Sequence, residues 1–328
     1  MKLLQVRPIT LLLIMIASIM ICHAAEAQPF KISFLPQWQP QAQFAGYYVA
    51  QEMGIYKKYG LSVKIMQGGP EAPSASMLEQ HKVDVATMFL SSAITEKAKG
   101  LDIINIGQVS QMSSLIFVAK KSSGIRKPED MNGKKIGIWR SDFREVPFAF
   151  LDEYHIKATI VPISSTVDLF LEDGIDVMAV EWYNEYHQIL NAGYNPDELV
   201  TFFFYDHNLN IPEDGFYCLK STYDKNPKMY DRFVKASMEG WDYAFKHPDL
   251  AVDIVIYYMR LSHIPANKAH QYWMLNRMKD IIHSQGMNNM ALKETDFART
   301  SYILLKNGMI NKSLSYKEFI RGYARAAK

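Results

Sequence analysis

Aromatic and acidic side chains follow two of the β-strand-like runs of this 328-residue sequence. The stretch WQPQAQFAGYYVA, Trp38–Ala50, comes after the run FKISFL, and Glu181-Trp182-Tyr183-Asn184-Glu185 comes after IDVMAV. Aromatic rings suit stacking on a flat ligand, and carboxylates accept hydrogen bonds from amino groups. These residue types together favour binding of a small, flat, nitrogen-containing compound.

Other strand ends carry further candidates. Gly68-Gly69 comes shortly after the run LSVKIM, and Ser91-Ser92 comes directly after VDVATMFL. Trp139 is the last residue of the run KKIGIW, and Arg140 follows it. Backbone N–H groups at turns and helix starts bind acceptor groups, although these residues equally suit ordinary capping, core-edge packing or a solvated helix start. The predicted ligand-binding residues are Trp38, Gln43, Phe44, Tyr47, Gly69, Ser91, Ser92, Trp139, Arg140, Glu181, Trp182, Tyr183, Asn184 and Glu185.

The sequence contains none of the common motifs of catalysis or metal binding. GxSxG, HExxH, GxxxxGK and GxGxxG are absent, and the nine histidines lack metal-ligand spacing. Beyond residue 27, Cys218 is the only cysteine, which excludes an internal disulfide. The formal net charge is +2, of which residues 1–27 contribute one positive charge. We therefore predict no enzyme, no cofactor, no metal and no nucleic-acid partner.

The order of the elements predicts an α/β fold with two lobes. Strand-like and helix-like runs alternate from Phe30, and a second series begins near residue 134. Crossings near Lys120–Gly124 and Asn210–Phe216 place residues 28–120 plus 216–328 in lobe 1 and 121–215 in lobe 2. Each lobe is expected to hold a mainly parallel sheet flanked by helices. Ligands of such sheets bind at the carboxyl ends of strands, here between the lobes.

The N-terminal residues have the pattern of a secretory signal peptide. Lys2 and Arg7 precede an apolar run, and Ala25-Glu26-Ala27 suits cleavage near Ala27, so we expect a periplasmic or secreted protein. A retained anchor is the alternative. Cys22 lacks the preceding leucine and small residue of a lipid-modified cysteine, which disfavours a lipoprotein.

The segments Trp38–Ile65 and Val180–Leu190 resemble the periplasmic substrate-binding proteins of ABC importers, in the branch that carries pyrimidine precursors of thiamine. That branch is related to the thiamine-pyrimidine synthase and more distantly to sulfonate-binding proteins. The family's first segment typically reads W-x-P-x-x-x-H-x-G-x-Y-x-A. It is matched by Trp38, Pro40, Gly46, Tyr48 and Ala50.

Two departures from the family pattern bear on function. Phe44 stands where the synthase has a histidine that is consumed as substrate, and the synthase's iron-binding cysteine cluster is missing. The second family pattern, W-N-Y-E, is met only loosely by Trp182–Glu185, with tyrosine and asparagine exchanged. The resemblance thus implies binding through aromatic and acidic residues, and it argues against pyrimidine synthesis.

The leading hypothesis is a monomeric binding protein that delivers a thiamine pyrimidine precursor, or a related heterocycle, to an inner-membrane permease. Binding of sulfonate-like anions is an alternative, with Arg140 and Arg144 as anion partners. A sensory ligand-binding protein and, less favoured, a pyrimidine-synthesising enzyme are further alternatives.

Overall fold

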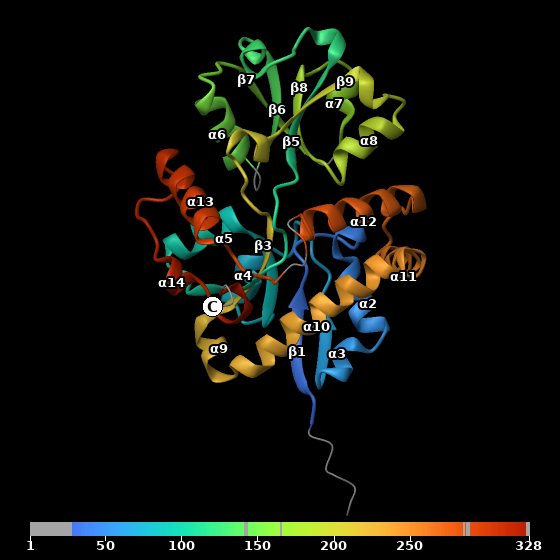
Figure 1. Cartoon of the computed structure of the whole chain (residues 1–328), viewed down its shortest axis with the longest axis vertical. Helices are drawn as coiled ribbons and strands as arrows, with labels where there is room; N and C mark the ends of the chain where they lie inside the picture. The colour runs from blue at the N-terminus through green and yellow to red at the C-terminus, as the bar shows by residue number, and fades with distance from the viewer. Residues whose placement is uncertain (1–27, 141–143, 165, 285, 287–288, 326–328) are drawn as a thin grey trace, which may run out of the picture.

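Two five-stranded sheets lie one above the other along the long axis of the molecule (Figure 1). The computed structural model describes residues 28–140, 144–164, 166–284, 286 and 289–325. The predicted signal peptide, residues 1–27, lies outside them. No helix of the described residues is long and apolar enough to cross a membrane.

The lower sheet has the strand order β2-β1-β3-β10-β4. Strand β1 pairs in parallel with β2 and β3, whereas β10 is antiparallel to both of its neighbours. Its strands are β1 (Phe30–Leu35), β2 (Leu61–Ile65), β3 (Val85–Phe89), β4 (Ile103–Gln108) and β10 (Asp214–Leu219).

The upper sheet repeats this arrangement with the order β7-β6-β8-β5-β9. Here β6 is parallel to β7 and β8, and β5 is antiparallel to β8 and β9. Its strands are β5 (Leu115–Lys120), β6 (Lys135–Trp139), β7 (Thr159–Ile163), β8 (Val177–Glu181) and β9 (Leu199–Phe203). The predicted two-lobed α/β fold is confirmed, with one antiparallel strand inside each sheet.

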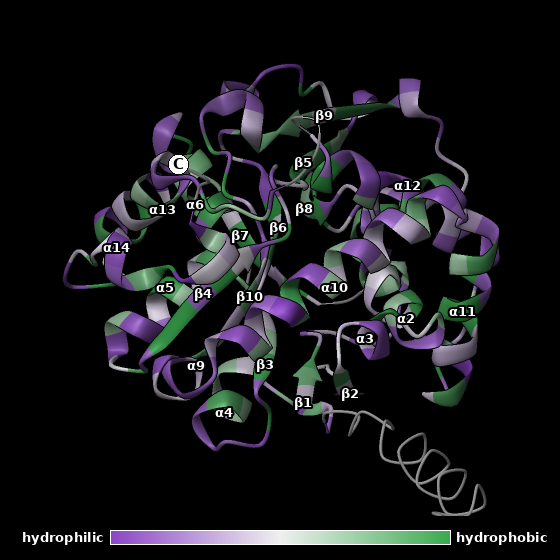
Figure 2. Cartoon of the chain, turned by 60° about the horizontal axis from the view of Figure 1, so that its bottom comes forward, coloured by the Kyte–Doolittle hydropathy of each residue, from purple (hydrophilic) through white to green (hydrophobic). Residues whose placement is uncertain are grey.

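Helices cover both faces of each sheet, which is why the central strands are apolar on both sides. Every residue of β4, β5 and β10 is buried. Figure 2 shows β1, β3 and β4 in green, whereas the surrounding helices alternate between green and purple. The lower lobe carries α2 (Ala45–Glu52), α3 (Ile55–Lys58), α4 (Ser74–Glu79), α5 (Leu90–Lys99), α9 (Lys220–Lys225), α10 (Pro227–Lys246), α11 (Pro248–Leu261), α12 (Lys268–Ile282), α13 (Glu294–Lys306) and α14 (Tyr316–Phe319), and the upper lobe carries α6 (Glu145–Glu153), α7 (Asp168–Leu171) and α8 (Glu185–Asn191).

The strand membership differs from the sequence prediction at two places. Strand β5, assigned to lobe 1 by the predicted boundary at residue 120, pairs in the upper sheet, and β10 was not predicted as a strand at all. The glycine- and proline-rich segment after Lys120 suggested a crossing, but it forms short 3-10 turns on the upper lobe. The chain crosses at residues 109–114 and again at 208–213, and the second of these overlaps the crossing predicted near Asn210–Phe216. The exact domain boundaries remain a prediction.

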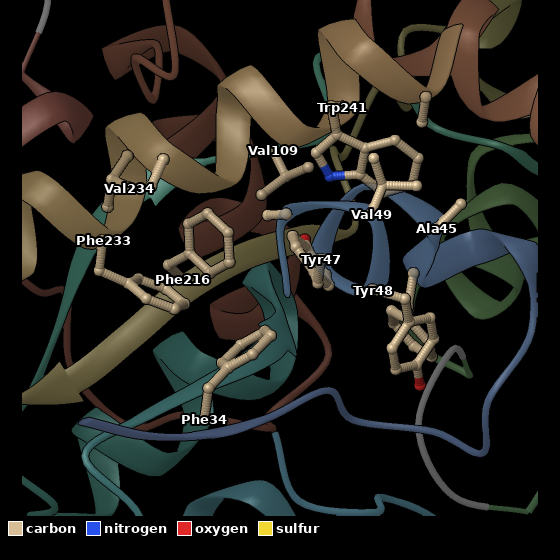
Figure 3. Packing of buried hydrophobic residues seen from close by; sticks show 14 of the residues in the cluster. Phe34, Ala45, Tyr47, Tyr48, Val49, Val109, Phe216, Phe233, Val234 and Trp241 are labelled. Atoms are coloured by element: carbon tan, nitrogen blue, oxygen red, sulfur yellow. The ribbon is translucent and has the colours of Figure 1, made fainter. Parts of the chain in front are cut away.

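The predicted aromatic wall at Trp38–Ala50 mostly forms the lower core. Figure 3 shows Tyr47 among the rings of Phe34, Phe216 and Trp241, with centroid separations of 5.0, 5.5 and 5.6 Å. Gly46 lies where α2 crosses α10, and a Cβ at this position would come within 2.4 Å of the Trp241 ring. This glycine therefore permits the close crossing of the two helices.

Candidate functional site

Four buried carboxylates gather where the two lobes meet. Glu181 ends β8, Glu185 begins α8, and Glu213 and Asp214 lie where the second crossing enters β10. Their side chains are between 2% and 5% exposed. No ion pair among the described residues includes any of the four. We call these four residues the carboxylate junction.

Asp214 is held by two amides from the loop after β1. Gln37 Nε2 donates to Asp214 Oδ1 at 2.5 Å, and Gln43 Nε2 donates to Asp214 Oδ2 at 3.2 Å. Gln43 is itself oriented by Gln41, whose amide donates to Gln43 Oε1 at 2.7 Å. The predicted binding residue Gln43 thus points at a carboxylate that the sequence prediction omitted.

Glu213 ties together the two crossings between the lobes. Ser113 Oγ donates to Glu213 Oε1 at 2.6 Å, and the Ser114 backbone N–H lies 3.1 Å from both carboxylate oxygens. The Ser113 N–H donates to Asn210 Oδ1 at 2.8 Å, which adds a second link between the crossings. The Glu213 carbonyl also accepts from the Leu90 N–H at 3.1 Å, at the start of α5.

Glu181 and Glu185 complete the junction from the upper lobe. Ser114 Oγ donates to Glu181 Oε2, whereas Glu181 Oε1 is buried and has no hydrogen-bond partner within the part of the chain that the structure describes. Glu185 accepts from the Glu181 N–H at 2.9 Å and from Asn184 Nδ2 at 2.6 Å. Because an unsatisfied buried acceptor is unfavourable, Glu181 Oε1 is the position in the junction most in need of a donor.

Burial dominates the ionisation of the junction. It raises the pKa of Glu213 to about 8 and of Glu185 and Asp214 to about 7, and hydrogen bonds only partly offset this. Burial, followed by the charge of Glu213, raises the pKa of Glu181 well above its usual range. Near neutral pH these groups therefore share protons, and a bound cation or donor would favour their ionised forms.

Tyr183 and Trp182 flank the junction. Tyr183 is buried within the hydrophobic cluster of the lower lobe although its chain segment belongs to the upper lobe. Burial, and then the charge of Glu181, raises the pKa of its hydroxyl well above the usual range. Trp182 is half-buried, and its backbone N–H donates to the Ser114 carbonyl at 2.9 Å. Both residues thus connect the strand end to the opposite lobe or to the crossing.

The remaining predicted residues do not all gather at this junction. Phe44 and Tyr47 are fully buried in the lower core, where they stack at 6.2 Å, because large apolar rings beside a strand end gain most by packing. Trp38 is half-buried against the same core. Gly69 and Ser91 are buried in the lower lobe and Ser92 is half-buried there. Whether any of these residues contacts a ligand remains a prediction.

In the upper lobe, Trp139 lies at the end of β6 beside β8, whose last residue is Glu181, whereas Arg144 lines a separate surface hollow. Trp139 Nε1 donates to the Ala179 carbonyl at 3.1 Å, inside the sheet, and Arg140 is exposed. Arg144 is exposed, stacks on Phe148 at 5.4 Å, and lines a surface hollow of about 640 Å³ formed by α6, the following loop and the end of α13.

Sequence reasoning missed Glu213, Asp214 and the serines of the first crossing. A usable signal was present, because Glu213-Asp214 interrupts the otherwise apolar run from Ile211 to Leu219, in a segment already identified as a crossing. Adjacent acids within a buried run need hydrogen-bond partners or a ligand. In the described part of the chain, no group of three or more His, Cys, Asp and Glu is arranged to hold a metal ion.

The architecture is that of the periplasmic binding proteins. The aliphatic sulphonate binding protein SsuA of Escherichia coli superposes with a TM-score of 0.70 at 13% identity, over 92% of this chain and 94% of that one. At this identity the likeness shows the fold alone. The family described as NMT1/THI5 like matches residues 41–251, more than half of the sequence, and the chain belongs to that family.

Two relatives differ in what their names describe. The riboflavin-binding protein RibY of Chloroflexus aurantiacus is 24% identical over 254 residues, covering 72% of this chain and 69% of that protein. The 4-amino-5-hydroxymethyl-2-methylpyrimidine phosphate synthase of Aspergillus parasiticus is 23% identical over 262 residues and 73% of each chain. The prediction that this protein is not an enzyme is contradicted, because similar proteins include named synthases. The absent motifs, Phe44 and the missing cysteine cluster were too narrow a basis for that exclusion.

Proposed function

We propose that this protein binds a small nitrogen-containing solute, either a cation or a compound rich in N–H donors, at the carboxylate junction. The observation that carries the proposal is the bare oxygen Glu181 Oε1, which is buried among three further carboxylates that lack cationic partners. A ligand that donates to Glu181 Oε1 would remove an unsatisfied acceptor and offset the mutual repulsion of the carboxylates.

The ligand would bridge the two lobes. Glu181 and Glu185 belong to the upper lobe, whereas Asp214 is held by Gln37 and Gln43 of the lower lobe. A donor-rich compound between them would favour the closed arrangement only if its donors match both sides. Trp182 and Tyr183 lie beside these carboxylates and would contact a flat ring, as the sequence pattern predicts.

The physiological role that we propose is solute capture for import. The fold, the family and the names of similar binding proteins support this role. In this proposal residues 1–27 direct export, cleavage follows Ala27, and the loaded protein delivers its solute to a permease in the inner membrane. A thiamine pyrimidine precursor and a flavin are the first two ligand classes to test, because relatives are named for each.

The junction argues against the alternative of a sulfonate-like ligand. Ionised carboxylates at the junction would repel an anion, and Arg144 lines a separate hollow on the upper lobe. Arg144 therefore does not support that alternative.

Isothermal titration of the purified mature protein tests the proposal. We expect an aminopyrimidine or a flavin to bind, and alkanesulfonates of similar size to give no heat. Because the pKa values of the junction are raised, binding of a cation at pH 7 should release protons, so the measured heat should depend on the ionisation enthalpy of the buffer.

The variant Glu181→Gln provides the residue-level control. It keeps the size of the side chain but removes the charge, and it should weaken binding by about tenfold or more, equivalent to about 1.4 kcal/mol. Glu172→Gln, an exposed position at the end of α7, is the matched control and should bind normally. Unchanged affinity in Glu181→Gln, or tight binding of a sulfonate, contradicts the proposal.

A further inference from the structure

A second contact between the lobes joins α8 of the upper lobe to α12 of the lower lobe, which lies directly beneath it (Figure 1). His187 on α8 and His270 on α12 stack at 5.1 Å with 11° between their planes, and their Nδ1 atoms are 2.8 Å apart. The other neighbour of His187 is Trp273, stacked at 4.6 Å and 8°. Three nearly parallel rings thus connect the two helices.

The hydrogen bonds around Asn184 fix the protons of this pair. Asn184 Nδ2 donates to Glu185 Oε1, so its Oδ1 is the acceptor that faces His270 Nε2 at 3.0 Å. Gln188 Nε2 also donates to this Oδ1. His270 therefore carries its proton on Nε2, and its Nδ1 accepts from Nδ1–H of His187. A second proton on His270 would place two N–H groups face to face.

This chain of hydrogen bonds reaches the carboxylate junction. His270 of the lower lobe orients Asn184, Asn184 donates to Glu185, and Glu185 accepts from the backbone of Glu181. The histidine pair therefore has a structural route to the groups that we propose contact the ligand. Loss of the pair would release both the helix contact and the orientation of Asn184.

Few charges face the pair. Arg277 of α12 lies over the rings of Trp273 and Trp182 at 4.9 and 4.7 Å, and its guanidinium pairs with Asp280 at 2.9 Å. On the α8 side the hydrogen-bond network reaches Glu185 through Asn184, and the ring of Tyr186 lies 6.3 Å from that of Trp273. Asn191 Nδ2 lies 3.3 Å from His187 Nδ1; because an amide N–H can only donate, this weaker contact competes with the shorter one in which Nδ1–H of His187 donates to His270. Among the described residues, no carboxylate is hydrogen-bonded to either imidazole to stabilise its charged form.

We propose that His187 and His270 form an acid-sensitive clasp that holds the lobes closed and positions Asn184 and Glu185 for the ligand. His187 and His270 are positioning residues in this account and do not themselves touch the ligand. The clasp deepens the proposed function. Only the predicted effect of the clasp on ligand affinity rests on that function.

The ionisation of the pair gives the direction of the effect. Burial, and then the charge of His187, lowers the pKa of His270 from 6.5 to about 4, and burial lowers the pKa of His187. The closed form therefore favours neutral imidazoles. The free energy by which the histidine pair stabilises the closed form has its full value above about pH 6.5 and is lost as the pH falls from there toward 4. The junction carboxylates, with raised pKa values, act in the opposite direction, because protonation in the closed form favours closure as the pH falls.

A distance measurement in the ligand-free protein tests the clasp. Spin labels on cysteines introduced at the exposed positions Asp197, in the upper lobe, and Lys246, in the lower lobe, report the lobe separation by pulsed electron paramagnetic resonance. The native Cys218 is buried. His270→Gln is the comparison variant, because its amide can still donate to Asn184 and cannot be protonated.

We expect the ratio of open to closed protein in the wild type, relative to His270→Gln, to rise on the order of tenfold between pH 7.5 and pH 5. His187→Phe keeps a ring against Trp273 and removes only the titration of His187. Because burial still lowers the pKa of His270, this variant should show a pH response between those of wild type and His270→Gln. A parallel pH response in wild type and His270→Gln would overturn the clasp, since a purely structural contact would shift closure equally at every pH.

Ligand affinity is measured separately in the same proteins. If the lobes open in acid and no nitrogenous ligand binds, the clasp stands and the proposed function fails. If a ligand binds but the lobe distance responds to pH in the same way with and without the histidines, the clasp fails and the proposed function stands.

Discussion

The segments Trp38–Ala50 and Glu181–Glu185 look alike in sequence, since each places aromatic and polar residues after a strand, but they have different roles. The first sends Phe44 and Tyr47 into the lower core, and its Gln43 donates to Asp214 of the junction, whose charge also acts on the Tyr47 hydroxyl. The second brings two carboxylates to the lobe contact. A buried aromatic ring stabilises the fold even when no ligand is bound. A buried carboxylate that has no cationic partner is unfavourable until a ligand supplies one. Of the two, the buried carboxylate is the more informative mark of a binding site.

The largest expected effect separates core from site within the first segment. Phe44→Ala should lower the free energy of unfolding by about 3–5 kcal/mol, because it removes a fully buried ring from the lower core. Urea unfolding measures this. Tyr302→Ala, at a position 64% exposed, serves as the control and should change stability by less than about 0.5 kcal/mol. If Phe44→Ala has the stability of the wild type but no longer binds the ligand, Phe44 belongs to the binding site.

The corresponding change in the second segment should affect binding. Trp182→Ala combined with Glu185→Gln should weaken the native ligand by well over tenfold, more than about 1.4 kcal/mol, since it removes a ring and a carboxylate beside Glu181. Titration calorimetry gives the affinity, with circular dichroism to check the fold. Wild-type affinity in this double variant would remove the segment from the site.

The junction also predicts how the stability of the ligand-free protein depends on pH. Glu213 has a pKa of about 8 in the folded protein against an ordinary 4.5, so the folded state holds the proton more tightly. Its contribution is complete below about pH 4.5 and is lost as the pH rises toward 8. The free energy of unfolding should therefore fall by about 1 kcal/mol from pH 7 to pH 8, a range above the titration of the histidine pair.

Glu213→Gln is the control for this dependence, since it cannot titrate and should flatten the decline. A stability that rises over the same interval in the wild type would show that the carboxylates are ionised and compensated in the empty protein.

The smallest effect is expected at an exposed ion pair between the lobes. Lys306 of α13 pairs with Asp152 of α6 at 3.0 Å, and both side chains are about half exposed. Lys306→Ala should change the free energy of unfolding only slightly, and less at high salt, because solvent and salt screen an exposed ion pair. A larger loss would mean that surface pairing, rather than the junction and the histidine clasp, holds the lobes together.

The sequence predicted the architecture well because alternating apolar runs report burial directly. Strand β10 was not predicted, because it begins with Asp214-Gly215, a pair typical of turns, before its apolar residues. The antiparallel partners that bury it lie more than a hundred residues away, at β3 and β4. Local patterns carry no information about such pairing.

The candidate site was predictable only in part. Glu181 and Glu185 were found because they stand directly after a strand, and the role of Asn184 as a donor to Glu185 follows from its place before α8. The hydrogen bonds of Ser114 with Glu181 and of Gln37 with Asp214 join residues that are far apart in the sequence. They form only because the fold brings the two crossings close together. The contact of His187 with His270 joins residues from different lobes, and neither residue has a local pattern that indicates it.

The most direct test of the central claim is mass spectrometry of the small molecules released from the purified mature protein, with wild type and Glu181→Gln prepared in parallel. We predict that the wild type carries a nitrogenous compound with several N–H donors or a positive charge, and that Glu181→Gln loses it while remaining folded. A sulfonate or another anion in the wild type, or equal retention of the compound by Glu181→Gln, would contradict the assignment of the carboxylate junction as the binding site.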